Sequence, residues 1–234
     1  MIDGAYPDPK RKDNTFEKLI FGTEEYLMDI DSEKKMESCP GAITVSDAKL
    51  LAFPVRSNIA PFVWVTCPAV LARLDRDLAM MGRAGIENLS ACKADKDAAV
   101  CLAGGISGEV LLEDAVVRVE ANPLTVGFID KNLGEIERLL LISDEMYAYC
   151  VSTCTEVQTQ IKIDEKTGTA EGGALRYEEL LPADSVLYTV VAFDKAGLDN
   201  DLQVDMVQGK VQELIAGFMQ IGGDATLGRG ICRI

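Results

Sequence analysis

The residues best suited to bind a ligand lie near the C-terminus, where four glycines fall within nine positions. Glycine backbones adopt positive φ and approach a ligand closely, and successive N–H groups can then form a nest for phosphate oxygens. An arginine adds a planar fork of donors that matches a phosphate group. The residues of this candidate phosphate site are Gly222, Gly223, Thr226, Gly228 and Arg229.

The pattern of this Gly-rich segment excludes two familiar phosphate loops. It lacks the Gly-Lys-Ser/Thr ending of a Walker loop. We also expect it to follow a helix and precede a strand, whereas a Rossmann fingerprint follows a strand and opens a helix. The segment therefore either binds phosphate groups or forms a tight connection between the last helix and the last strand.

A second candidate site is the pair Arg56 and Ser57, which follows the apolar run LLAFPV. A strand that ends in Arg-Ser at a chain reversal can present a guanidinium and a hydroxyl to a phosphate. Taken alone, this pair is a weaker signal than the Gly-rich segment.

The composition excludes several kinds of chemistry. The 234 residues include no histidine, which rules out imidazole general bases, His-containing nucleophile triads and His metal ligands in this chain. The formal charge is −15, from 38 acidic and 23 basic residues. Because phosphate neutralisation supplies the affinity of lone nucleic-acid-binding proteins, the chain needs a local basic strip or many copies sharing one strand.

The seven cysteines are irregularly spaced, and the N-terminal MIDGAYPDPKRKDN has no apolar signal core. Both features predict reduced thiols and a cytoplasmic location. Cys150 and Cys154 are either two metal ligands or two small residues on adjacent helical turns, and no second Cys pair completes a zinc site. No apolar run is long enough to predict a membrane span.

Hydrophobic periodicity predicts both helices and strands. The predicted strands are 43–55, 62–65, two short strands within 109–121, a hairpin formed by 157–163 and 174–177, 185–193 and 231–234. The predicted helices are 15–21, 68–81, 133–141, 143–151 and 204–219, and 82–108 is predicted to be a weakly structured loop. This order predicts an α+β domain of the ferredoxin-like type. Residues 1–42 are polar and offer no good first strand.

Three motifs occur in order: LLAFPVRS with FVWVTCP, then STCTEVQTQIKIDEKTGTAEGGALRYEELLPADSVLY, then QIGGDATLGRG. They resemble the backbone subunit of type III-B CRISPR effector complexes, the Cmr module of the RAMP superfamily. The resemblance runs from about Leu19 to the C-terminus, which is more than 200 residues. It implies a single RAMP-type domain over 1–234, with an RRM-like, ferredoxin-like palm and a protruding β-hairpin thumb at 155–182. A Gly-rich loop and last strand then occupy 221–234.

The resemblance also implies partners and RNA-binding residues. In the family, copies stack along a guide crRNA in a helical backbone, bind target RNA and other subunits of the complex, and are not membrane proteins. The thumb wedges between nucleotides, and Ile161, Ile163 and Leu175 would do so here. The implied RNA-binding residues include Lys162 and Arg176 of the thumb, and Lys166 is a further cation there. The others belong to the two candidate sites above: Arg56, Ser57, Gly222, Gly223, Thr226, Gly228 and Arg229.

One part of the family pattern is missing from this sequence. Family members begin with a strand, a loop that carries a catalytic Asp, and a Ser-Leu-Lys-Gly turn. Asp3, Asp8 and Asp13 are not in that motif, so the catalytic residues are unknown and no metal ligands are assigned; Mg²⁺ or another divalent metal would be needed if cleavage is retained. The alternatives are an active metal-dependent endoribonuclease in the same complex and a stand-alone protein that binds a phosphorylated metabolite.

Overall fold

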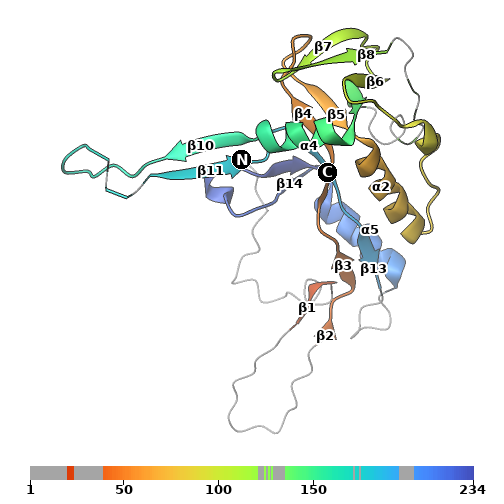
Figure 1. The fold of residues 1–234 in the computed structure, drawn as a ribbon. Helices are drawn as coiled ribbons and strands as arrows, with labels where there is room; N and C mark the ends of the chain where they lie inside the picture. The colour runs from red at the N-terminus through yellow and green to blue at the C-terminus, as the bar shows by residue number, and fades with distance from the viewer. Residues whose placement is uncertain are drawn as a thin grey trace. The chain divides into compact units, whose positions relative to one another are not determined.

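The computed structural model describes residues 20–23, 39–120, 124, 126, 128, 135–170, 172–173, 175–194 and 203–234. The chain divides into two compact units. We call Ala48–Thr189 the central unit, and Met1–Asp47 with Val190–Ile234 the terminal unit. Figure 1 labels most of the helices and strands of both.

A seven-stranded sheet forms most of the central unit. In spatial order its strands are β12 (Val186–Tyr188), β4 (Lys49–Val55), β5 (Val63–Thr66), β9 (Leu139–Ile142), β6 (Ala98–Ala103), β8 (Ala115–Val119) and β7 (Gly108–Leu112). The β5–β9 and β6–β8 pairs are parallel, and the other neighbours are antiparallel. A bridge between Ser57 and Leu112 brings edge strand β7 beside the chain that follows β4, so the sheet curls strongly.

Two helices pack into the core of this sheet. Helix α2 (Pro68–Met80) begins with Pro68 in its first turn, and it buries Val70, Leu71, Leu74 and Leu78 at helical spacing. Helix α4 (Asp144–Thr153) begins after Ser143, whose Oγ accepts a hydrogen bond from the N–H of Met146. Both helices were predicted from the sequence, including the serine cap. A short 3₁₀ turn, η1 (Leu89–Ala91), follows α2.

The predicted β-hairpin is present directly after α4. Its strands, β10 (Glu156–Gln160) and β11 (Arg176–Leu180), pair antiparallel with Thr159 opposite Tyr177. Figure 1 shows the hairpin extending away from α4. At the tip, Asp164 Oδ1 accepts hydrogen bonds from the N–H groups of Lys166 and Thr167, so the side chain stabilises the turn.

The terminal unit consists of short paired elements. Its strand pairs are β1 (Gly22–Thr23) with β2 (Cys39–Pro40), β3 (Ile43–Val45) with β13 (Val191–Phe193), and β14 (Phe218–Gln220) with β15 (Ile231–Arg233). Helix α5 (Val204–Ile215) buries Val207 and Val211 in a small core with Ile20 and Ala42. The 3₁₀ turn η2 (Ala225–Leu227) lies between β14 and β15.

Two predicted elements of the central sheet were wrong. The predicted helix 133–141 contains instead strand β9, whose Leu139–Ile142 are all buried; a short apolar run fits either type of element, and its neighbours decide. The predicted loop 82–108 contains strand β6, which lies between β9 and β8. Its alanines carry little β-propensity, so the sequence signal is weak.

Three further boundaries differ from the prediction. The predicted strands 43–55 and 185–193 are each two strands, and the divide between the units falls between the two. Helix α5 ends at Ile215 because the backbone turns at Gly217, with φ +95°, and Phe218–Gln220 then pair with β15. Of the predicted helix 15–21, residues 15–19 lie outside the described residues.

No helix among the described residues is long and apolar enough to cross a membrane. The free thiols are Cys67, Cys92, Cys101, Cys150, Cys154 and Cys232. Burial raises the pKa of the Cys150 thiol to about 12.

Candidate nucleic-acid interface

The Arg56 side chain is held by a two-point ion pair at the end of β4. Its Nε donates to Glu113 Oε2 at 3.0 Å, and its Nη2 lies 3.0 Å from Glu113 Oε1. The side chain is still 79% exposed. A shallow hollow of about 320 Å³ adjoins it, lined by Arg56, Ser57, Asn58, Leu111 and Glu113. The guanidinium and hydroxyl predicted to meet a phosphate therefore lie together at one hollow.

Backbone and side-chain hydrogen bonds fix this turn against the β7–β8 hairpin. The N–H of Glu113 donates to the carbonyl of Arg56 at 2.9 Å. The N–H of Leu111 donates to Asn58 Oδ1, also at 2.9 Å. Together with the Ser57–Leu112 bridge, these bonds hold residues 56–58 in one place, so the arginine projects from an ordered support.

The tip of the β7–β8 hairpin also contacts helix α4, close to where β10 starts. Tyr149 Oη donates to Asp114 Oδ1 at 2.6 Å, and this contact raises the pKa of the tyrosine. Burial is the main cause of the raised pKa of Cys154, and the charges of Glu113, Arg56 and Asp114 also act on it. The Arg56 turn therefore lies near the root of the β10–β11 hairpin.

The hairpin cations predicted to contact RNA lie on an exposed surface. Arg176 donates from Nε to Gln160 Oε1 and also lies 3.3 Å from Glu178 Oε1. Lys162 is exposed just beyond the end of β10. Arg176 is thus oriented by its neighbours, and both cations are accessible to a ligand that approaches the hairpin.

The hairpin also exposes several apolar side chains along its length. Ile161, Ile163 and Leu175, predicted from the family resemblance, are about half exposed. Sequence reasoning missed Val157 and Tyr177, which are more exposed still, Tyr177 at 69%. The aromatic residue stands out within RYEEL, and its position in a hairpin strand is the signal that could have identified it.

The Gly-rich segment connects two strands, not a helix and a strand as the sequence predicted. It joins β14 to β15, and the N–H of Ile221 donates to the carbonyl of Gly230 at 2.8 Å. Arg229 Nη1 forms an ion pair with Asp224 Oδ2 at 2.7 Å, and the arginine side chain is only 23% exposed. This arginine is folded onto its own loop.

The two halves of the Gly-rich segment differ in their free donors. The N–H groups of Leu227, Gly228 and Arg229 donate to the carbonyls of Asp224 and Ala225, so these donors are already used. Gly222, Gly223 and Thr226 are exposed. An anion bound by this loop would therefore contact its first half. Arg56, Ser57, Lys162 and Arg176 lie in the central unit, and the Gly-rich segment lies in the terminal unit.

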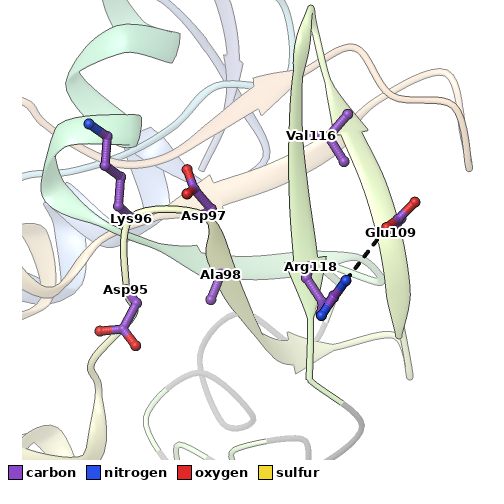
Figure 2. Close-up of a pocket in the computed structure, with 7 residues that line it drawn as sticks. All are labelled: Asp95, Lys96, Asp97, Ala98, Glu109, Val116 and Arg118. Atoms are coloured by element: carbon purple, nitrogen blue, oxygen red, sulfur yellow. Dashed lines mark ion pairs between the residues drawn. The ribbon is translucent and has the colours of Figure 1, made fainter.

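A larger hollow, of about 510 Å³, lies over β6, β7 and β8, and Figure 2 shows the residues that line it. Three acidic residues and two basic ones line it: Asp95, Asp97 and Glu109, with Lys96 and Arg118. Arg118 Nη2 lies 3.8 Å from Glu109 Oε1. Its mixed, mainly acidic lining is a poor surface for a phosphate backbone. None of the predicted RNA-binding residues lines it.

Within the described residues, no group of three or more Cys, Asp or Glu side chains is arranged to hold a metal ion. The donor set for the divalent metal expected from the family resemblance is therefore not found in this part of the chain. No metal-dependent step is assigned to these residues.

Comparison with known proteins places these features in a family context. A sequence profile described as the RAMP superfamily matches residues 2–233. The chain is 31% identical over 219 residues to the CRISPR system Cmr endoribonuclease Cmr4 of Pyrococcus furiosus, and the match covers 87% of this chain and 71% of the relative.

Solved structures show the same similarity. Oligomeric Cmr4 from Pyrococcus furiosus matches at 26% identity with a TM-score of 0.60, over 82% of this chain and 72% of that chain. A chain of the type III-B Cmr-beta complex in its apo state matches at 19% identity with a TM-score of 0.68, over 93% of this chain and 74% of that chain. At 19% identity, the second match shows a similarity of fold alone. The α+β fold class and the resemblance to the Cmr module are both confirmed.

Proposed function

The chain belongs to the RAMP superfamily, and we propose that it is a guide-RNA-binding backbone subunit of a type III-B CRISPR complex. In this role it binds crRNA and target RNA, and it assembles with copies of itself and with the other subunits. The similar structures are of an oligomeric Cmr4 and of Cmr-beta complexes, one of them bound to cognate target RNA, and they support these partners.

The observation that carries this proposal is the exposed surface of the β10–β11 hairpin. A soluble hairpin gains nothing from exposing Val157, Ile161 and Tyr177 to water, since apolar burial stabilises folding. Unpaired bases stack on aromatic and apolar side chains, and each stacked base contributes roughly 1–3 kcal/mol to binding. Nearby Lys162 and Arg176 supply charge for the phosphates. The combination suits a thumb that separates stacked nucleotides.

We assign the guide backbone to the ordered Arg56–Ser57 turn and to the exposed first half of the Gly-rich segment. Arg56 and Ser57 offer charged and neutral donors, and Gly222, Gly223 and Thr226 offer accessible backbone and a hydroxyl. Gly228 and Arg229 are assigned to the structure of that loop, because their donors already bond within it.

The acidic composition fits a shared strand better than a lone RNA-binding protein. A charge of −15 repels RNA at a distance, so each copy contributes a local contact and the affinity comes from many copies on one guide. We therefore expect the isolated chain to bind RNA weakly and in a strongly salt-dependent way.

The experiment compares two charge reversals of matched size in the full chain. Arg176→Glu changes a cation of the hairpin that is 65% exposed, and Arg118→Glu changes an arginine that is 79% exposed and also pairs with a glutamate on β-structure. Each variant is co-expressed with guide RNA, and the retained RNA is measured across a sizing column. Arg176→Glu should reduce the retained RNA about tenfold, because a hydrogen-bonded charged contact contributes roughly 1.5–3 kcal/mol.

Arg118→Glu is the control for the change in net charge. It should retain RNA within about twofold of the wild type, since a single added repulsion far from the contact is largely screened by salt. An equal loss of retained RNA in the two variants would mean that the hairpin makes no specific contact with RNA. A wild-type protein that carries no RNA under these conditions would contradict the proposed function itself.

A further inference from the structure

Glu113 adopts a backbone conformation that its residue type rarely takes. Its φ is +55°, in the left-handed region, at the tight turn between β7 and β8. Two other non-glycine residues among those described share positive φ, and they are Asn88 and Asp184, types whose short side chains tolerate this region better. A glycine would fit the backbone at Glu113 without strain. The carboxylate therefore occupies a strained position where a side chain is not required for the turn.

The contacts of Glu113 converge on one partner. Its backbone N–H donates to the Arg56 carbonyl, and its two carboxylate oxygens contact Nε and Nη2 of the same arginine. The carboxylate is 28% exposed, whereas the arginine side chain is 79% exposed. Glu113 is therefore the more buried member of the ion pair, and it holds the exposed Arg56 side chain in place.

The geometry of the Arg56 guanidinium decides which of its N–H donors remain available to a ligand. Arginine presents five N–H donors along two forked edges. Glu113 occupies the edge formed by Nε and Nη2. The end formed by the two Nη atoms is not used by this ion pair, and it is an edge on which a phosphate can bind through two hydrogen bonds.

We propose that Glu113 is a positioning residue that holds Arg56 in a fixed orientation for an RNA phosphate. This inference rests on the proposed function and goes beyond it, because it assigns an RNA-binding role to a carboxylate that touches no RNA. Asp114, the second carboxylate of the turn, also supports it. Asp114 accepts a hydrogen bond from the Tyr149 hydroxyl and so ties the turn to α4.

Two opposing effects make the proposal testable by its sign. A free arginine side chain loses rotamer freedom on binding, and an arginine already fixed loses less, so Glu113 favours binding. A carboxylate near a phosphate also repels it, so Glu113 as a mere counter-ion would oppose binding. Removal of the carboxylate therefore weakens RNA binding if Glu113 positions Arg56, and strengthens it if Glu113 only neutralises Arg56.

The experiment uses Glu113→Gly, which removes the carboxylate and relieves the positive φ, and Glu113→Gln, which keeps one acceptor and the side-chain length. Binding of the full-length chain to a fluorescein-labelled single-stranded RNA of about 30 nucleotides is measured by anisotropy at fixed salt. We expect Glu113→Gly to bind about threefold to fivefold more weakly, although it is at least as stable thermally as the wild type. Glu113→Gln should bind close to the wild type.

A double-mutant cycle with Arg56→Ala separates positioning from a general structural effect. In the Arg56→Ala background, Glu113→Gly should change the affinity by less than about 1.5-fold, because no guanidinium remains to be positioned. Unchanged or tighter binding by Glu113→Gly alone would overturn the inference, as would an equal loss in both backgrounds. If Arg56→Ala itself weakens binding while Glu113→Gly does not, only this inference fails; if the wild type binds no RNA, the proposed function fails.

Discussion

The Arg56 turn and the Gly-rich loop each carry an arginine paired with a carboxylate, but the two arginines differ in exposure. Arg56 is held at 3.0 Å by Glu113 and remains 79% exposed. Arg229 is held at 2.7 Å by Asp224 and is only 23% exposed. The first pair joins segments that are 57 positions apart in sequence, and the second closes a loop of its own neighbours.

This difference teaches that an ion pair alone does not tell whether an arginine is available to RNA. A carboxylate on one edge of an exposed guanidinium orients it and leaves the other end accessible. A carboxylate that folds the arginine onto its own loop stabilises the loop and hides the charge. We therefore propose Arg56 as an RNA contact and Arg229 as a structural residue of the β14–β15 connection.

The largest expected effect concerns the structural role of the Gly-rich loop. Gly230 has φ +72°, and a Cβ there would lie 1.9 Å from the carbonyl oxygen of Ile221. Gly230→Ala should lower the free energy of opening of the β14–β15 hairpin by about 3 kcal/mol, through steric overlap with a backbone atom and strain at positive φ. Hydrogen-exchange mass spectrometry of residues 218–234 should show roughly 100-fold faster exchange.

The matched control for this prediction is Gly223→Ala in the same loop. Nothing lies within 4 Å of a Cβ at Gly223, so we expect a change below about 0.5 kcal/mol. Similar exchange rates in the two variants would show that the loop is not closed in the way that the Ile221–Gly230 contact indicates.

An intermediate effect separates the two arginines directly. Arg56→Ala should weaken RNA binding about tenfold, and the slope of log affinity against log salt should fall by about 0.7, as one phosphate contact is lost. Arg229→Ala should change RNA affinity less than about twofold while it speeds hydrogen exchange in β14–β15. Fluorescence anisotropy over a salt series measures both variants. A larger loss of affinity for Arg229→Ala than for Arg56→Ala would reverse the comparison.

A third ion pair extends the comparison to a carboxylate whose contacts serve to join elements of the fold. Asp77 Oδ2 in α2 accepts hydrogen bonds from Lys49 Nζ and Tyr188 Oη, both at 2.7 Å. Arg73 donates to the same tyrosine hydroxyl and to the carbonyl of Leu50. These contacts join α2 to β4 and to edge strand β12. The ammonium of Lys49 is the main cause of the lowered pKa of Asp77, and the tyrosine hydroxyl adds to it.

The smallest expected effect is the pH dependence of this pair. Because the pKa of Asp77 is lower in the folded chain than its value of about 3.9 in unfolded chains, its contribution to stability is present above that value. The contribution is lost as pH falls through the folded pKa. Asp77→Asn should therefore unfold at a lower temperature than the wild type at pH 7, and the difference should shrink below about pH 4. A difference that stays constant down to pH 3, measured by circular dichroism, would contradict the role of the charge.

The sequence predicted those elements whose signals are local. Helix α2 was found from Pro68 and the spacing of its leucines, and α4 from Ser143 and the acidic residues that follow it. The β10–β11 hairpin was found from alternation around a turn-rich tip. Strands β6 and β9 were missed because their residues fit a helix or a loop equally well until the neighbouring strands pair with them.

For the candidate site, the sequence identified residue types but not their partners. The motif resemblance selected Arg56, Arg176 and Arg229 together, since each lies in a matching segment. Nothing in those segments indicated that Glu113 holds Arg56 or that Tyr177 is 69% exposed. The Arg56–Glu113 contact joins positions 57 apart in sequence, and the exposure of Tyr177 depends on what packs against the hairpin in the folded chain.

By itself, the sequence determined the family, the α+β class, the acidic charge, the absence of histidine, and the hairpin with its cations. Local periodicity, turn residues and motif order are sufficient for these, because each is a property of neighbouring residues. Only the tertiary structure decided which arginine stays exposed and which closes a loop. That outcome depends on contacts such as Arg56–Glu113, which form when the curled sheet brings β7 back beside the end of β4.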